Sequence, residues 1–511
     1  MHAQVVIVGG GPVGMLVAAE LGAYGVRTLV LEERAGISGR PRASTLHARA
    51  LQCLVRRGYL PELVPGAGGA GGVGVEATAP FHFAGLSGLA ITAPAAEPGP
   101  ILKRPQAELE RVFEQRARSV GARVLRGYRV AGVAQDQGGV QVVAEGPSGV
   151  VLCTAEYLVG ADGARSTVRE QGGVACAVYP ATVSALAGLV RLSDPDALPP
   201  GWHQTPRGWI VARNDPGQGT HIRTLNCAGE DPRRHLPLTL EELRQEVSRI
   251  AGRGIAMEDP RWLSRFSDFS RLARTYRSGR ILLAGDAAHV HFPIGGQGLS
   301  TGVQDALDLG WKLAFTVRGL AGEGLLDTYD QERRPAARRV IDNTRAQLSL
   351  MRPDPGLDAL RSLFNTLLGP GQEGGRLGDM ISAQDTVLPR HTRCPSAWEG
   401  RFLQNVGLAS REGPTDVIEL LRAGEGRFLL LLFGECGSRY LREAQAWADG
   451  LCPVWAEPTP AVPFDALLVR PDGYVAWAPG GGSLDAALAL YLRGIPAARR
   501  EPVMPGVQAL G

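Results

Sequence analysis

Three glycines and an acid near the N-terminus have the types and the spacing of a phosphate-binding turn. In VVIVGGGPVGMLVAAELGAYGVRTLVLEER, which begins at Val5, Gly9, Gly11 and Gly14 follow a short β-branched run. The first glycine permits a tight turn, the second lets a pyrophosphate approach the backbone, and the third lets the next helix pack closely on the strand. Glu32 ends a second predicted strand, where its carboxylate can accept hydrogen bonds from a ribose. The pattern predicts a site for the adenosine of FAD or NAD, because Glu32 would repel the 2′-phosphate of NADP.

A second glycine-rich stretch, LLAGDAAHVHFPIGGQGLSTG, occupies residues 282–302. A strand-like run from Ile281 to Ala284 breaks at Gly285-Asp286, passes through a Pro-Gly loop and is predicted to restart as a helix near Ser300. The positive end of such a helix favours negative charge on a ligand. An ordinary strand-to-loop turn is the alternative for Gly285-Asp286 taken alone. The whole stretch is typical of a segment that holds a ligand.

The predicted elements around these motifs form an interrupted α/β pattern. Strand, turn, helix and strand open the chain, and an amphipathic helix follows within ILKRPQAELERVFEQRARSVGARVL, which starts at Ile101. Alternating strands and turns then take over, with one helix at Leu240 to Ile250, before the α/β pattern resumes at Gly279. We therefore predict an α/β fold with a discontinuous Rossmann-type domain at residues 1–175 and 277–390, interrupted by a β-rich substrate-binding domain at 176–276.

The C-terminal part, residues 394–511, is predicted to be a third unit. It contains a strand at RFLLLLF, a strand pair in DALLVRPDGYVAWA that folds at Pro471-Asp472-Gly473, and a final helix from Leu484 to Leu492. No CxxC pair occurs in it, so dithiol chemistry is not expected. A role in packing or in oligomer formation is the expectation.

The composition excludes several classes of partner. The 511 residues carry a net charge of only +3, without a Lys/Arg block, so neither nucleic acid nor an anionic membrane is expected to bind. The seven cysteines are an odd set, which argues against disulfides and zinc sites. The longest apolar run, Phe428 to Phe433, is too short to span a bilayer, and no secretory signal precedes the first strand. We expect a cytoplasmic protein.

Three motifs in fixed order resemble one family. The fingerprint at Gly9, the sequence GADGARSTVR at Gly160 and the stretch from Leu282 resemble the FAD-dependent aromatic hydroxylases, the single-component class A flavoprotein monooxygenases. LHARALQCLVRRG at Leu46 and LLVRPDGYVAWA at Leu467 are similar to the branch that acts on aromatic polyketides and rifamycins. The resemblance implies that the discontinuous domain is a GR2-like FAD-binding domain and that the C-terminal domain is thioredoxin-like.

The resemblance also implies which residues hold a non-covalent FAD. Asp286 would accept a ribityl hydroxyl, Pro293 would lie against the flavin, and the glycines that follow would bring backbone amides close to the ring. The start of the next helix would favour the reduced, anionic flavin. The expected cofactor-binding residues are Gly9, Gly11, Pro12, Val13, Gly14, Glu32, Glu33, Arg42, Gln106, Asp162, Asp286, Pro293, Gly295, Gly296, Gly298, Leu299 and Ser300.

Several of these residues have a simpler alternative role. Asp162 could form an Asx turn that caps a helix at Ser166. Arg42, the one candidate for a catalytic side chain, could be a solvated surface charge. His289 and His291 have no acidic or Cys partner in their pattern, so no metal site is expected and we interpret them as loop-packing residues.

Other residues depart from the family or remain undecided. The family often has Asn at the positions of Ser300 and Asp308, and we assign Asp308 no role. Aromatic residues of the β-rich insert could contact the substrate, although each is more often a core residue. They are Trp202, Trp209, Trp262 and Phe266.

The function implied by the resemblance is hydroxylation of a polycyclic phenolic substrate. NADPH or NADH would bind transiently as co-substrate, and O2 would react through a flavin C4a-hydroperoxide, so few catalytic side chains are needed. A Baeyer-Villiger oxygenase of the same family is an alternative, and a catalytically silent flavin- or ligand-binding protein is another. The WxWxIP signature of flavin-dependent halogenases is absent. The resemblance leaves a homodimer open.

Overall fold

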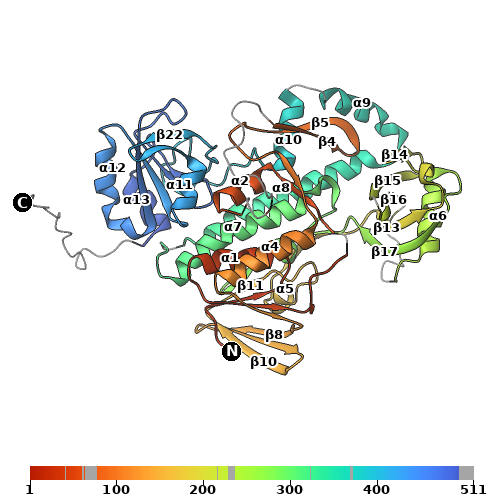
Figure 1. The fold of residues 1–511 in the computed structure, drawn as a ribbon, viewed down its shortest axis with the longest axis horizontal. Helices are drawn as coiled ribbons and strands as arrows, with labels where there is room; N and C mark the ends of the chain where they lie inside the picture. Colours follow the sequence, from red (N-terminus) through yellow and green to blue (C-terminus); the bar gives the residue numbers. More distant parts are fainter. Residues whose placement is uncertain are drawn as a thin grey trace, which may run out of the picture. The chain divides into compact units, whose positions relative to one another are not determined.

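The computed structural model describes residues 1–40, 42–59, 63, 77–215, 217–227, 229, 236–322, 324–368 and 372–493 (Figure 1). The chain separates into two compact units. The first contains residues 1–55, 59–310 and 329–386, and the second contains residues 56–58, 311–328 and 387–511. Each unit has a mixed α/β architecture.

A six-stranded sheet forms the centre of the first unit. Its order is β19 (Arg277–Ser278), β20 (Ile281–Leu283), β11 (Tyr157–Gly160), β1 (Val5–Val8), β2 (Thr28–Glu32) and β7 (Arg123–Arg126). All neighbours from β20 to β7 pair in parallel, and only β19 pairs antiparallel. Every residue of β1 and β2 is buried, as expected for strands of a parallel sheet that is covered on both faces.

The helices of this unit follow the predicted order. They are α1 (Pro12–Ala23), α2 (Ala48–Arg56), α4 (Gln106–Ser119), α5 (Thr167–Gln171), α7 (Gly298–Val317), α8 (Asp327–Met351), α9 (Asp358–Leu367) and α10 (Gln372–Ser382). The last residues of α2 and α7 and the first of α8 belong to the second unit. Helix α4 confirms the predicted amphipathic helix, since Leu109, Phe113 and Ala117 are buried. It packs against α1.

The parallel pairing brings the sequence motifs to one edge of the sheet. Strand β1 ends before Gly9, β2 ends at Glu32, β11 ends before Ala161 and β20 ends before Ala284. Ligands of open α/β sheets bind outside the carboxyl ends of the strands. This edge is therefore the place to look for the site.

Three small sheets complete the framework. They are β8 (Arg129–Gln135), β9 (Val140–Gly146) and β10 (Gly149–Ala155); the pair β3 (Thr45–His47) and β6 (Ile101–Lys103); and the hairpin β4 (Ala77–Phe83) and β5 (Leu86–Ala93). Most of the glycine-rich sequence before β4 lies outside the described residues. Because β3 pairs with β6, Thr45 lies directly opposite Lys103.

The insert is a five-stranded antiparallel sheet with one helix. Its order is β14 (Gly201–Thr205), β15 (Gly208–Asp215), β16 (Gly219–Leu225), β13 (Ser184–Leu192) and β17 (Met257–Ser267). Helix α6 (Leu240–Ala251), shown beside this sheet in Figure 1, confirms the predicted helix. A capping box between Thr239 and Glu242 starts it. A separate sheet joins β12 (Cys176–Tyr179), β18 (Ser270–Ala273) and β21 (His289–Val290).

The two faces of the five-stranded sheet have different neighbours. Ile210, Ala212 and Ile222 pack with the apolar side of α6. Trp209 and Leu225 belong instead to a cluster that includes residues of the β4–β5 hairpin and of α8. Because side chains alternate along a strand, the residues in register with Trp209 point away from α6.

The second unit is built around another six-stranded sheet. Its order is β23 (Gly413–Asp416), β22 (Gly407–Ser410), β25 (Leu451–Ala456), β24 (Phe428–Phe433), β26 (Ala466–Val469) and β27 (Val475–Trp477). Its helices are α11 (Val417–Ala423), α12 (Gly437–Ala444) and α13 (Leu484–Tyr491). Strand β24 is wholly buried, which confirms the predicted strand RFLLLLF.

Residues far upstream of the C-terminal part complete the second unit. Trp311 donates its indole N–H to Asp472 at 3.1 Å, and the guanidinium of Arg470 stacks over its ring. Arg56 donates to the carbonyl of Leu403 at 2.9 Å. The core of this unit is thus assembled from three stretches of chain.

All seven cysteines are free thiols. Among the described residues, no helix combines the length and the apolar character that crossing a bilayer requires.

Candidate active site

The turn after β1 has the geometry that its glycines predict. Gly9 has φ +107°, and a Cβ there would collide with the carbonyl of Ala161. A Cβ on Gly14 would collide with the carbonyl of Gly9, so helix α1 packs on the turn without space for a side chain. At Gly11, by contrast, a Cβ would meet no protein atom within 4 Å. The backbone at Gly11 is therefore open to a ligand.

Glu32 lies beside this turn. Its carboxylate accepts the N–H of Gly10 at 2.5 Å and the N–H of Arg34 at 2.9 Å, and the residue is 8% exposed. Two backbone donors fix the carboxylate at the carboxyl end of β2, where a ribose would approach. The neighbouring Glu33 is exposed and carries no such contact.

Val13 joins the two glycine-rich segments. A Cβ on Gly285 would lie 3.1 Å from a methyl group of Val13, and one on Gly302 would lie 2.7 Å from it. Pro12, the first residue of α1, has the fixed φ that suits this position. The helix that follows the first motif therefore packs against both ends of the second.

The second glycine-rich segment contains an exposed acid, Asp286, and a glycine loop at Pro293–Gly296. Asp286 is exposed although the residues on either side of it are buried. Pro293 is also exposed, and Gly295 and Gly296 both have left-handed φ values, +72° and +62°. Such backbone geometry favours glycine.

Helix α7 begins at Gly298, two residues before Ser300, in agreement with the predicted helix start near that residue. The chain turns at Gly295 and Gly296, and the helix begins two residues later, at Gly298. Leu299 is buried, and Ser300 lies within the first turn, where its hydroxyl accepts the N–H of His47 at 3.0 Å. The Ser300 hydroxyl thus has a partner within the protein.

His47 is a buried residue that sequence reasoning missed. Its Nε2 forms a hydrogen bond of 2.8 Å with the carbonyl of Gly295, and burial lowers its pKa to about 4. The neutral imidazole therefore ties β3 to the loop of the second motif. The signal in the sequence was a histidine at the start of LHARALQCL, a segment in which apolar residues predominate.

A buried ion-pair network supports the same segment. Asp305 of α7 accepts the backbone N–H of Gly285 at 3.1 Å, lies 2.7 Å from Nε2 of His289 and accepts Nε–H of Arg333 at 2.9 Å. Burial alone would raise the pKa of Asp305, but His289 and Arg333 outweigh it and hold the pKa below its usual value. His289 is thus a hydrogen-bond partner of Asp305 as well as a packing residue. Among the described residues, no cluster of three metal-ligating side chains occurs.

Asp162 adopts the helix-capping geometry that was the simpler alternative. Its Oδ2 accepts the N–H of Val168 at 3.1 Å, while Ser166 caps α5 through Arg169 N–H at 2.9 Å. Burial raises the pKa of Asp162. Its second oxygen, Oδ1, is buried without a partner among the described residues. Because a Cβ on Gly9 would also touch the backbone of Asp162, this oxygen lies near the fingerprint turn.

Arg42 lies just before β3, and Gln106 is the first residue of α4. Arg42 is exposed, which fits either a ligand contact or a solvated charge. Gln106 opens α4 and donates its backbone N–H to the carbonyl of Ala43 at 3.0 Å. This bond holds the Arg42 segment against α4.

A cavity of about 490 Å³ lies between the loop of the second motif and the insert. The loop contributes residues 293–296, and the insert contributes Trp202, Trp209 and Phe266. Trp209 is held by a hydrogen bond of 2.6 Å from its indole N–H to the carbonyl of Met351. Three of the four predicted aromatic residues therefore line the cavity, and Trp262 is not among its lining residues.

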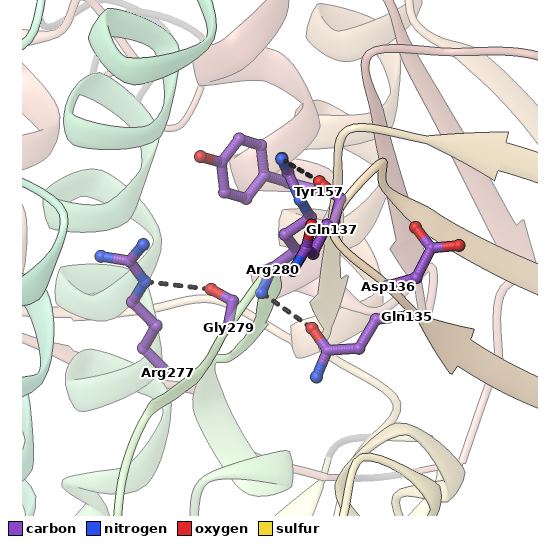
Figure 2. Close-up of a pocket in the computed structure, with 7 residues that line it drawn as sticks. All are labelled: Gln135, Asp136, Gln137, Tyr157, Arg277, Gly279 and Arg280. Carbon is purple, nitrogen blue, oxygen red and sulfur yellow. Dashed lines mark hydrogen bonds between the residues drawn. The ribbon is translucent and has the colours of Figure 1, made fainter.

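A second hollow, about 580 Å³, opens at the other edge of the central sheet (Figure 2). Tyr157 begins β11 there, and Arg280 precedes β20. Arg280 donates its backbone N–H to Gln135 and its guanidinium to the carbonyl of Gln137, both at 2.9 Å, and Arg277 donates to the carbonyl of Gly279 at 3.1 Å. These groups bind one another at the amino ends of the strands, so we assign this hollow no ligand.

The residues at the carboxyl edge fit FAD. The open face of Gly11 suits a pyrophosphate, the fixed carboxylate of Glu32 suits a ribose, and the exposed Asp286 suits a ribityl chain. The unpartnered Oδ1 of Asp162 adds a polar group to this edge. The glycines of the loop Pro293–Gly296 carry no side chain that would keep a ring system away from the backbone. The parallel sheet and the residues at its carboxyl edge are together typical of a flavoprotein.

Comparison with known proteins identifies the family. Residues 2–344 match the family described as FAD binding domain, and residues 396–495 match the one described as aromatic-ring hydroxylase, C-terminal. The chain belongs to the FAD-dependent aromatic hydroxylases, and it is a monooxygenase of that family.

Its relatives cover nearly the whole chain. A 12-dehydrotetracycline 5-monooxygenase/anhydrotetracycline 6-monooxygenase of Streptomyces rimosus is 38% identical over 93% of this chain and 95% of its own. A rifampicin monooxygenase of Streptomyces venezuelae is 36% identical over the same shares. The solved structure of OxyS anhydrotetracycline hydroxylase from Streptomyces rimosus is similar with a TM-score of 0.85 at 35% identity, over 96% of this chain and 99% of that one.

Replacing Glu32 by alanine is expected to weaken FAD binding by about 1 to 3 kcal/mol, the size of a lost hydrogen bond to a charged group. Titration of the apoprotein with FAD measures the change. Glu443→Ala, which removes a half-buried acid from α12 in the second unit, serves as the control and should leave FAD binding unaltered. Equal affinities of the Glu32 variant and the wild type would mean that the carboxylate does not contact the cofactor.

Proposed function

We propose that the protein hydroxylates a polycyclic phenolic substrate, such as an aromatic polyketide or a related natural product, with O2 and with NADPH or NADH. One observation carries the proposal: the aromatic walls Trp202, Trp209 and Phe266 enclose the same cavity as the loop Pro293–Gly296. Bound FAD would supply the redox chemistry, taking electrons from the nicotinamide and delivering one oxygen atom through a C4a-hydroperoxide. The names of the relatives support the substrate class.

The side chains of the cavity would position the ring and exclude water. Burial lowers the pKa values of His47 and His82 to about 4, so both imidazoles are neutral at physiological pH. His82 lies 4.5 Å from Trp202 between ring centroids, and it closes part of the aromatic wall. A wall of neutral rings suits the flat ring system of an aromatic substrate and leaves the flavin as the reacting group.

The nicotinamide nucleotide would bind transiently, since the chain has one complete strand-turn-helix fingerprint and the FAD occupies it. The exposed loop at Arg165, next to the capping turn of Asp162, is the segment we propose for this encounter.

We also propose the finer description of the fold. The central sheet with its fingerprint turn supports a Rossmann-type, GR2-like FAD domain at residues 1–175 and 277–390, interrupted by a substrate domain at 176–276. The central pairing of β24 with parallel β25 and antiparallel β26 supports a thioredoxin-like C-terminal domain without CxxC at 394–511.

A phenolic polycyclic substrate is expected to raise NAD(P)H oxidation at least several-fold, and the product formed under labelled O2 should carry one labelled atom. Absorbance at 340 nm follows the first effect, and mass spectrometry follows the second, with anthracene as the non-phenolic control. Label entering from water, or oxidation that no aromatic compound stimulates, would contradict the proposal. A labelled lactone in place of a phenol would identify Baeyer-Villiger chemistry instead.

A further inference from the structure

Among the described residues of the insert, Arg223 is the cation that lines the cavity. Arg223 lies on β16 directly opposite Val211 of β15, which in turn lies opposite Trp202 of β14. All three side chains line the cavity. Their shared row across the sheet places a guanidinium two strands away from an indole, on the wall that faces the loop of the second motif.

Arg223 lines the cavity without a counter-charge among the described residues. Its side chain is accessible, yet burial lowers its pKa, and the nearby charge of Arg213 lowers it further. The exposure of the side chain and the lowered pKa are both explained by its position in the cavity wall. Protein atoms surround part of the side chain there, and the rest faces the cavity. No described residue forms a hydrogen bond or an ion pair with it. A guanidinium in a cavity wall without a counter-charge among the described residues can pair with an anionic group of a ligand.

The other lining residues offer no counter-charge. Among the described residues of the cavity wall there is no Asp or Glu, and the second charged side chain is Lys103 of β6. Burial, with smaller contributions from His47 and Lys103, lowers the pKa of His82 to about 4, so that imidazole carries no charge at neutral pH. The cavity is thus aromatic, electropositive and free of acidic groups along its described wall.

We propose that the cavity selects its aromatic substrate in an anionic form and that Arg223 pairs with the acidic oxygen, with Lys103 adding a weaker long-range attraction. The inference rests on the proposed function of this cavity as the substrate site. A guanidinium binds a carboxylate, an enolate or a phenolate through charge-assisted hydrogen bonds, which are stronger than neutral ones and fix direction. Arg223 would therefore decide which ring of the substrate faces the loop Pro293–Gly296.

Two probes that differ mainly in charge test this inference. Anthraquinone-2-carboxylate and anthraquinone-2-carboxamide are titrated by calorimetry into the protein with FAD bound. The wild type is expected to bind the carboxylate at least about tenfold more tightly, in line with a hydrogen bond between charged groups. In Arg223→Gln this preference should fall below about twofold, while the affinity for the carboxamide stays within about twofold of the wild type. Arg223→Lys should keep part of the preference.

The matched control is Arg213→Gln, which removes the same charge from the neighbouring strand at a residue that does not line the cavity. It should leave the preference within about twofold of the wild type. FAD content and the melting temperature establish that each variant is folded. A preference that persists in Arg223→Gln, or equal binding of both probes to the wild type, would overturn the inference without touching the hydroxylase proposal. If neither probe binds, the substrate site itself is misplaced and both proposals fail.

Discussion

Gly11→Ala is expected to yield a folded protein that has lost FAD. A Cβ at this position would meet no protein atom within 4 Å, and φ −70° with ψ 177° is a conformation that alanine adopts readily. As the N-cap of α1, alanine is poorer than glycine, so the free energy of unfolding should fall by no more than about 1 kcal/mol. The new methyl group would instead occupy the space into which a pyrophosphate must come. We expect FAD affinity to fall at least about 100-fold, or about 2.7 kcal/mol.

Two further variants separate binding from folding. Gly14→Ala drives its Cβ into the carbonyl of Gly9, so it should lower the melting temperature as well as the FAD content. Gly407→Ala introduces the same methyl group at an equally open glycine of β22 in the second unit, and it should change neither quantity. Fluorescence titration of the apoprotein and thermal unfolding by circular dichroism give both readouts. Normal FAD affinity in Gly11→Ala would show that the pyrophosphate lies elsewhere.

Asp305→Ala should destabilise the first unit by about 3 to 5 kcal/mol, the usual result of removing one partner from a buried charge pair. Asp305 is fully buried, and its loss would take the carboxylate from Arg333 and an acceptor from the N–H of Gly285. Asp342→Asn breaks an exposed i,i+4 pair with Arg338 on α8, and it should cost less than about 0.5 kcal/mol. Urea unfolding of both variants measures the difference. Equal stability of the two variants would refute the structural role of the network.

The contribution of Asp305 also has a defined pH dependence. Its pKa in the folded protein lies below its ordinary value, so its stabilising effect is complete above about pH 4, the pKa of an unfolded aspartate, and is lost as the pH falls through the lower folded pKa. The stability difference between wild type and Asp305→Ala should thus stay constant from pH 5 to 8 and shrink below pH 4.

The parts of the structure that could be predicted from the sequence are those that depend on local sequence patterns. The fingerprint at Gly9, helix α6 and strand β24 each follow from a periodicity or a spacing within about thirty residues, where turn geometry and burial act directly. The sequence also named Trp202 and Trp209 of the insert as candidate substrate contacts, and both line the cavity.

The residues that sequence reasoning missed depend on distant partners. His47 meets a carbonyl 248 positions away, and Asp305 acquires its role only when Arg333 of another helix reaches it. Arg223 alternates with buried neighbours like any strand residue, and the sequence does not say which face of β16 meets a cavity. Trp262 illustrates the converse, since it shares the insert with Trp202 and yet does not line that cavity.

The second unit is assembled from three separate stretches of the chain, which limits how it could be exchanged between relatives. Its core includes Trp311 from the end of α7 and Arg56 from the end of α2, which bind Asp472 and Leu403. A recombination event that exchanged only the chain after residue 390 between two relatives would therefore separate these partners. An exchange that keeps this unit intact would have to include all three stretches of chain.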